Sequence, residues 1–229
     1  MLPVMTVVVA TRNPGKVAEI RAALEGLPIG LVAVTDLLKD APPIEETGAT
    51  FEENAVLKAR TVSAATHLVA LADDSGLEVD ALGGRPGVRS ARYARDGATD
   101  AENNAALLAA LTDIPSSERR ARFRCVMALW DPFSDDEPVV AEGSCDGWIG
   151  HQGRGSGGFG YDPLFVVDET GRTFAELTTE EKLAMSHRGR ALRAMRERIV
   201  ALVDVRQREA ATITALSGRR SVSPPEGLP

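Results

Sequence analysis

LVALADDSG, residues 68–76, joins an apolar run to two adjacent carboxylates. The run 68–72 is typical of a buried strand, and a second apolar stretch begins at Leu77. We therefore expect Asp73 and Asp74 at the end of a strand, where burying two charges is costly unless something compensates them. A divalent cation is the usual compensation, because hard cations prefer carboxylate oxygens. The stretch predicts a strand that ends at a cation site.

Strands and helices alternate on either side of this stretch. Apolar runs at 4–10, 123–130 and 163–167 indicate further strands. Helices are predicted after Asn13 and after three Thr-x-x-Glu capping boxes, which begin at Thr50, Thr99 and Thr178. The acidic segment 131–136 indicates a hairpin turn between 123–130 and 138–144. The pattern predicts an α/β protein with a mixed central β-sheet flanked by helices.

The length of 229 residues fits one domain, which we expect to cover residues 1–205. Its last helix is indicated by apolar residues on one face, from Leu192 to Leu202, with arginines on the other. The composition shifts to Ser, Arg, Pro and Gly after about Leu216. Residues 206–229 are therefore expected to form a largely disordered C-terminal extension.

Charge and composition exclude several classes of protein. A net charge of −7 leaves no basic footprint for a nucleic-acid partner. No apolar run approaches the length of a membrane span, and the short stretch 4–10 lacks the basic flank of a signal peptide. Two cysteines, Cys125 and Cys145, form neither a disulfide framework nor a zinc motif. We expect a cytoplasmic protein.

Two loops could contact an anionic ligand. TRNPGK, residues 11–16, lies between a predicted strand and helix, where backbone N–H groups and a lysine attract phosphate. Its spacing is not that of a Walker A loop, and a merely capped helix is the alternative. GRGSGG, residues 153–158, matches G-x-G-x-x-G, but no helix pattern follows it, so a Rossmann loop is excluded. It is either a surface connector or a glycine-rich loop that presents Phe159 to a flat ligand.

Other charged groups have ordinary explanations when each is taken alone. Glu45-Glu46 could be a solvated acidic turn, and Lys182, His187 and Arg188 could be a solvated helix end. Ser75 lacks a G-x-S-x-G elbow, so a serine nucleophile is poorly supported.

Taken in order, these stretches resemble the inosine triphosphate pyrophosphatase family, also described as dITP/XTP pyrophosphatases. The resemblance rests on TRNPGK (11–16), EETGATFEENAVLKA (45–59), ADDSGLEVDALGGRPGVRSARY (72–93), GGFGYDP (157–163), ELTTEEK (176–182) and SHRGRAL (186–192). It spans residues 6 to about 200. It implies Mg²⁺-dependent hydrolysis of ITP, dITP and XTP to the monophosphate and pyrophosphate. It also implies a homodimer, with the substrate cleft between two lobes of each subunit.

The resemblance also implies roles for particular residues. Asp74 matches the proton acceptor and a magnesium ligand, and Glu45 matches the other usual metal position, with Glu46 and Asp73 as possible helpers. The implied substrate-binding residues are Thr11, Arg12, Asn13, Pro14, Gly15, Lys16, Ser75, Phe159, Gly160, Tyr161, Asp162, Lys182, His187 and Arg188.

Two other functions remain open from the sequence. A regulatory module could keep the nucleotide pocket without the chemistry, although binding alone would not require Asp74. A metal-dependent phosphohydrolase could act on another damaged nucleotide, although His187 and Arg188 favour a 6-oxopurine because both can donate to that oxygen.

Overall fold

A computed structural model describes residues 4–40, 42, 44–134 and 137–219. Six strands form one mixed sheet in the order β2-β1-β3-β4-β5-β6. β1 pairs in parallel with β2 and β3, and the remaining pairs are antiparallel. The strands are β1 Met5–Val9, β2 Ile29–Ala33, β3 Val69–Val79, β4 Arg120–Trp130, β5 Val139–Ile149 and β6 Phe165–Val167. The predicted α/β class, the mixed sheet and the 123–144 hairpin are confirmed, although residues 135–136 of the turn lie outside the described residues.

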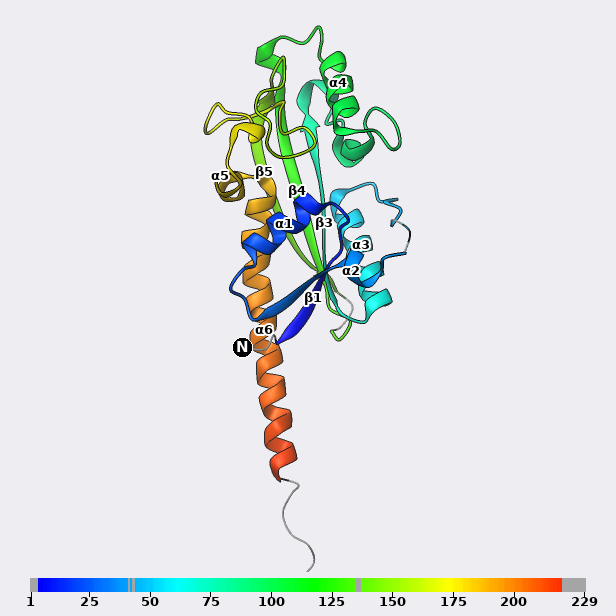
Figure 1. Ribbon diagram of the computed structural model, residues 1–229, viewed down its shortest axis with the longest axis vertical. Coiled ribbons are helices and arrows are strands. Elements are labelled where there is room, and N and C mark those ends of the chain that lie inside the picture. The colour runs from blue at the N-terminus through cyan, green and yellow to red at the C-terminus, as the bar shows by residue number, and fades with distance from the viewer. Residues whose placement is uncertain (1–3, 41, 43, 135–136, 220–229) are drawn as a thin grey trace, which may run out of the picture.

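Helices cover both faces of the parallel half of the sheet (Figure 1). α1 and α6 pack on one face, and α3 packs on the other. α4 packs on a third cluster at the far end of the long strands. The helices are α1 Pro14–Ala23, α2 Val34–Leu37, α3 Phe51–Thr66, α4 Asp100–Ala110, α5 Thr179–Met185 and α6 His187–Arg219. Short 3-10 helices span Asp80–Leu82, Gly87–Arg92, Ser116–Glu118 and Phe174–Glu176.

β3 is longer than expected, so the acidic pair Asp73-Asp74 does not lie at the end of a strand as predicted. The strand continues from Val69 to Val79, so Asp73 and Asp74 lie in its middle rather than at its end. The strand can continue because Leu77 and Val79 bury themselves in a second core beyond the pair. β1 pairs only with residues 69–71 of β3, so the pair lies just past the carboxyl end of β1. In α/β sheets this is the edge where ligands bind.

The predicted helix starts are confirmed in detail. The Asn13 side chain caps α1, and complete capping boxes begin α4 at Thr99 and α5 at Thr178. Thr50 makes half of its box, because it accepts from Glu53 N while the Glu53 carboxylate accepts from Ala49 N. Local side-chain chemistry thus determines where these helices begin.

The last helix extends past the expected domain boundary at residue 205. α6 runs without a break to Arg219, and residues 220–229 lie outside the described residues. The helix can continue because residues 206–216 include three alanines and two arginines, which favour helix, and contain neither glycine nor proline. Within the described part of the chain, none of the helices has the length and apolar character needed to cross a membrane. Both cysteines are buried and unpaired.

Candidate active site

The loop after β1 holds a lysine at the start of α1. Asn13 Oδ1 accepts hydrogen bonds from the backbone N–H groups of Gly15 and Lys16, at 2.9 and 3.3 Å. Lys16 Nζ lies 3.0 Å from Asp73 Oδ2, with only 16% of its side chain exposed. The lysine is therefore held at the sheet edge rather than left as a loose surface charge.

A cavity of about 160 Å³ opens past the carboxyl end of β1. It brings together residues from every predicted part of the site, although these are distant in sequence. Its predicted members are Asn13, Lys16, Asp74, Ser75, Phe159, Gly160, Tyr161, Asp162, Lys182, His187 and Arg188. Thr11, Arg12 and Pro14 instead line a separate depression on the outer side of the same loop.

Asp73 faces α1 and α6. Its Oδ2 lies 3.0 Å from Lys16 Nζ and 3.2 Å from Arg188 Nε, and the residue is 1% exposed. Burial alone would raise the pKa of Asp73, but Lys16 and Arg188 hold it well below its usual range. Arg188 also donates to Glu19 Oε2 at 2.6 Å and to Ser75 Oγ at 2.8 Å. Asp73 is thus an ionised anchor for two cations.

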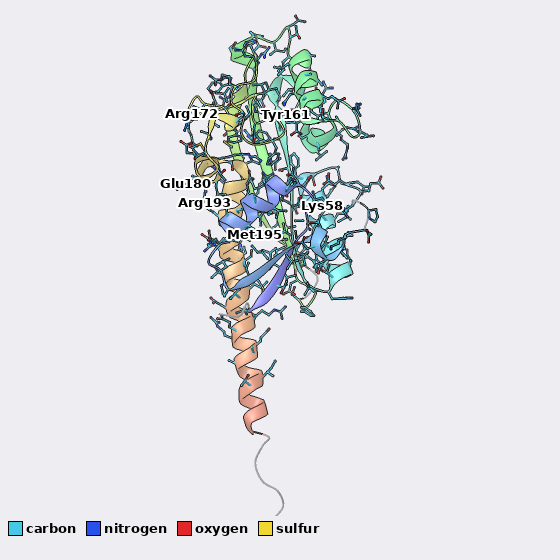
Figure 2. The ribbon with its side chains drawn as sticks, in the orientation of Figure 1. Lys58, Tyr161, Arg172, Glu180, Arg193 and Met195 are labelled. Carbon is cyan, nitrogen blue, oxygen red and sulfur yellow. The ribbon has the colours of Figure 1, made fainter. Side chains whose placement is uncertain are left out.

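Asp74 faces the opposite side of the sheet, towards α3. Its two oxygens accept from Lys58 Nζ at 3.1 Å and from Asn54 Nδ2 at 3.2 Å. Lys58 Nζ also lies 2.6 Å from Glu46 Oε1, and Figure 2 shows Lys58 on α3. Burial raises the pKa of Asp74 despite the opposing charge of Lys58. A carboxylate with a raised pKa is better suited to accept a proton than an ordinary one.

Sequence reasoning missed Asn54 and Lys58, which hold Asp74, and Glu19, which pairs with Arg188 and Lys182. Lys58 is 8% exposed and Asn54 is fully buried. Their spacing of four residues on α3 puts them on one face, which is the only local signal for this role. Nothing in the sequence distinguishes Lys58 from a solvated helical lysine, because its partners come from two other segments.

The glycine-rich loop is built into the site and is not a loose connector. Asp162 Oδ2 accepts from Phe159 N at 2.9 Å and from Lys182 Nζ at 2.6 Å. Gly158 has φ +74°, and a Cβ there would lie 1.9 Å from Asp162 Oδ2, so only glycine fits. Gly160 donates to Asp100 from its N–H and accepts from Asn104 at its carbonyl.

The basic residues at the start of α6 are buried. His187 is 3% exposed and stacks on Phe123, with ring centroids 4.6 Å apart. Burial, with the nearby charges of Arg188 and Lys182, holds the pKa of His187 well below its usual value, so its ring is neutral. Its Nδ1 makes no hydrogen bond within the described residues. These side chains belong to the cavity and not to a solvated helix end.

The carboxylates of Glu46 and Asp74 fit a divalent cation. Glu46 and Asp74 both reach one ammonium group, so their oxygens converge on a point where positive charge is stabilised. Two carboxylates suit Mg²⁺, which takes its other ligands from water and phosphate. In the described part of the chain, no cluster of three or more His, Cys, Asp or Glu residues could hold a metal alone. Glu45 is exposed and lies outside the cavity lining, so its role as a ligand stays a prediction.

This fold and site define an α/β enzyme whose cavity combines a helix N-terminus, a buried carboxylate and several cations. The family model described as the Ham1 family matches residues 7–198. The chain therefore belongs to the Ham1 family, which confirms the resemblance drawn from its motifs.

Similar proteins cover nearly the same segment. A protein of Pectobacterium atrosepticum named dITP/XTP pyrophosphatase is 53% identical over 189 residues, which are 82% of this chain and 95% of that protein. One of the same name from Geobacter sulfurreducens is 53% identical over 192 residues, 84% of this chain and 95% of its own length. The solved structure of a HAM1 protein from Coxiella burnetii has a TM-score of 0.78 at 45% identity, covering 88% of this chain and all of that one.

Proposed function

We propose that this protein is a Mg²⁺-dependent pyrophosphatase. It hydrolyses ITP, dITP and XTP to the nucleoside monophosphate and pyrophosphate, which clears deaminated purines from the nucleotide pool. The observation that carries the proposal is the joining, in one cavity, of Asp74 with a raised pKa to Lys16 at the start of α1. The names of the relatives support the substrate class.

Hydrolysis requires an oriented water and neutralised phosphates. The oxygen of the water forms a bond to the α-phosphorus, and Asp74 accepts the proton that the water loses. The bond from that phosphorus to the bridging oxygen breaks, and pyrophosphate leaves with the electron pair. Lys16 and the positive end of the α1 dipole stabilise the negative charge on the phosphates.

Magnesium would be held by Asp74 and an acidic partner from the loop before α3. Glu46 lines the cavity, so it is the better placed partner, although Glu45 was expected in this role. A bound Mg²⁺ supplies charge neutralisation and polarises a phosphoryl oxygen. Lys58 now occupies the point between these carboxylates and would have to yield it to the metal.

The base would lie between the loop 159–162 and the start of α6. A 6-oxo group needs a donor, and a 6-amino group would leave that donor unpaired. Arg188 already donates to Asp73, Glu19 and Ser75. His187 is neutral and lacks a partner at Nδ1 among the described residues, so we assign it the larger part in selecting a 6-oxopurine.

The remaining expectations complete the proposal. The cavity is the substrate cleft between two lobes, and the protein works as a cytoplasmic homodimer without a nucleic-acid partner. The three core clusters support two lobes, because two of them flank the parallel half of the sheet and the third fills its far end.

One experiment separates this function from its alternatives. The protein is incubated with Mg²⁺ and ITP, XTP, dITP, GTP or ATP, and the products are analysed. Pyrophosphate and IMP from ITP, with little turnover of ATP, are expected. Orthophosphate as the first product would contradict the proposal, turnover of other damaged nucleotides alone would favour a different phosphohydrolase, and binding without turnover would favour a regulatory module.

A further inference from the structure

Gly15 in the phosphate loop lies directly against the ring of Phe159. A Cβ on Gly15 would lie 2.9 Å from both Cδ1 and Cε1 of Phe159, closer than side chains approach one another. Gly15 lies in the first turn of α1, where its φ is not positive, so the backbone does not require glycine. Alanine would also be the better helix former. The close approach of the Phe159 ring, with Asn13 Oδ1 3.2 Å from the same Cβ, therefore accounts for glycine at this position.

Two cations also lie close to the ring of Phe159, which is half-buried. Lys182 Nζ lies 4.7 Å from the ring centroid, and Arg188 Cζ lies 5.6 Å from it. The backbone on either side is fixed by the hydrogen bonds of Phe159 N to Asp162 and of Gly160 N to Asp100. The ring is therefore held in one place, and Gly15 forms the side that belongs to the phosphate loop.

We infer that Gly15 is a positioning residue that seats Phe159 and so sets the spacing between the base contacts and the phosphate contacts. This inference rests on the proposed function, in which Phe159 contacts the purine and the loop 11–16 contacts the phosphates. The contact joins Gly15 and Phe159, which are 144 residues apart in sequence (159 − 15). A substrate that contacts both segments would then bind to a site in which the distance between base contacts and phosphate contacts is already set.

Gly15→Ala tests this directly. The added methyl group must push the ring away by some tenths of an ångström, while Asp74 and the Lys16 side chain stay in place. We expect the KM for ITP to rise by about tenfold with kcat within about twofold, because the lost contact is made equally in the ground state and the transition state. Gly153→Ala is the matched control, since a Cβ there would make only an ordinary contact of 3.4 Å with Pro163. An unchanged KM in Gly15→Ala would overturn the inference.

A double-mutant cycle separates an effect through Phe159 from a local effect on the phosphates. If Gly15 acts through the ring, Gly15→Ala has no further effect on the KM of the Phe159→Ala variant. Inhibition by inorganic tripolyphosphate, which has no base, should be the same for wild type and Gly15→Ala. A tenfold rise in both backgrounds, or a matching loss of tripolyphosphate affinity, would refute the inference.

The role of Gly15 can also be tested without enzyme activity. If the wild-type protein hydrolyses no nucleotide, the proposed function is overturned. The packing of Gly15 against Phe159 is then tested by stability. The wild type, Gly15→Ala, Phe159→Ala and the double variant are then compared by equilibrium unfolding. The changes in stability should be non-additive if the methyl group displaces the ring. Additive changes would show that Gly15 does not position Phe159.

Discussion

Asp73 and Asp74 are adjacent in sequence, yet they are neutralised by cations from opposite faces of the sheet. Successive side chains of a strand point to opposite faces. Asp73 meets Lys16 of α1 and Arg188 of α6, whereas Asp74 meets Lys58 of α3. Three side-chain cations therefore neutralise the pair in this structure, and the expected divalent cation stays a prediction. The pair divides into an anchor and a proposed base.

Replacing the proposed base should stop turnover without preventing binding. We expect Asp74→Asn to lower kcat by a factor of about 10²–10⁴, the usual contribution of a general base. The variant should still bind ITP, because Lys16 and the α1 N-terminus are unchanged. Calorimetric titration of the variant with ITP and Mg²⁺, beside an assay of pyrophosphate release, measures both. A fully active variant would show that another group takes the proton.

Replacing the anchor should mainly cost stability. Asp73→Asn leaves Lys16 and Arg188 with a neutral partner in a buried site, which should destabilise the fold by about 3 kcal/mol. Asp168→Asn is the matched control, because Asp168 pairs with Arg120 at the surface and should cost less than about 1 kcal/mol. Urea unfolding of both variants measures the difference. Equal losses would mean that Asp73 is not the anchor that its contacts indicate.

Much of the fold follows from local sequence signals. Asn13, Thr99 and Thr178 begin the helices for which their side chains are suited, and the apolar runs mark the strands. The continuation of β3 through Asp-Asp-Ser-Gly could not be predicted, because these residues favour turns over strands. Their burial depends on Arg188, which lies 115 residues from Asp73.

The sequence predicted those site residues that belong to recognisable motifs. His187, Arg188 and Lys182 line one cavity with Asp74, and their roles there stay a prediction. The structure adds Lys58, whose acidic partners come from β3 and from the loop before α3. The neighbours Glu45 and Glu46 look alike in the sequence, and only the path of the chain shows that Glu46 enters the cavity.

Removing the ammonium group between Glu46 and Asp74 tests the metal site without an activity assay. Lys58→Met leaves two carboxylates facing one another without a cation, so stability in EDTA should fall by roughly 3 kcal/mol. Mg²⁺ should then raise the Tm of this variant more than that of the wild type, because bound ligand stabilises the folded state. Lys39→Met, at an exposed lysine, is the control. No added effect of Mg²⁺ would argue against metal at Glu46 and Asp74.

The buried His187 should make stability depend on pH. Its pKa is held low by burial and by Arg188 and Lys182, so the folded protein keeps it neutral. Below about pH 6.5 the unfolded chain binds a proton there and the folded state does not, so stability falls as the pH falls. Between pH 7.5 and 5.5 this costs roughly 1 kcal/mol. Urea unfolding of wild type and His187→Gln at both pH values should show a smaller loss in the variant, and equal losses would mean that His187 is not buried in its neutral form.

Removing the phosphate-loop lysine should discriminate between parts of the substrate. Lys16→Ala should weaken the binding of ITP much more than that of inosine, because only ITP carries the phosphates that we assign to Lys16. Titration of both ligands into wild type and variant measures this. Equal weakening of both would show that Lys16 acts on the fold of the cavity as a whole.

The central claim is that water attacks the α-phosphorus of a 6-oxopurine nucleoside triphosphate beside Asp74. Hydrolysis of ITP in ¹⁸O-labelled water, followed by mass spectrometry of the products, tests it most directly. The label should appear in IMP, with unlabelled pyrophosphate as the other product. Label in pyrophosphate, or release of labelled orthophosphate, would contradict it.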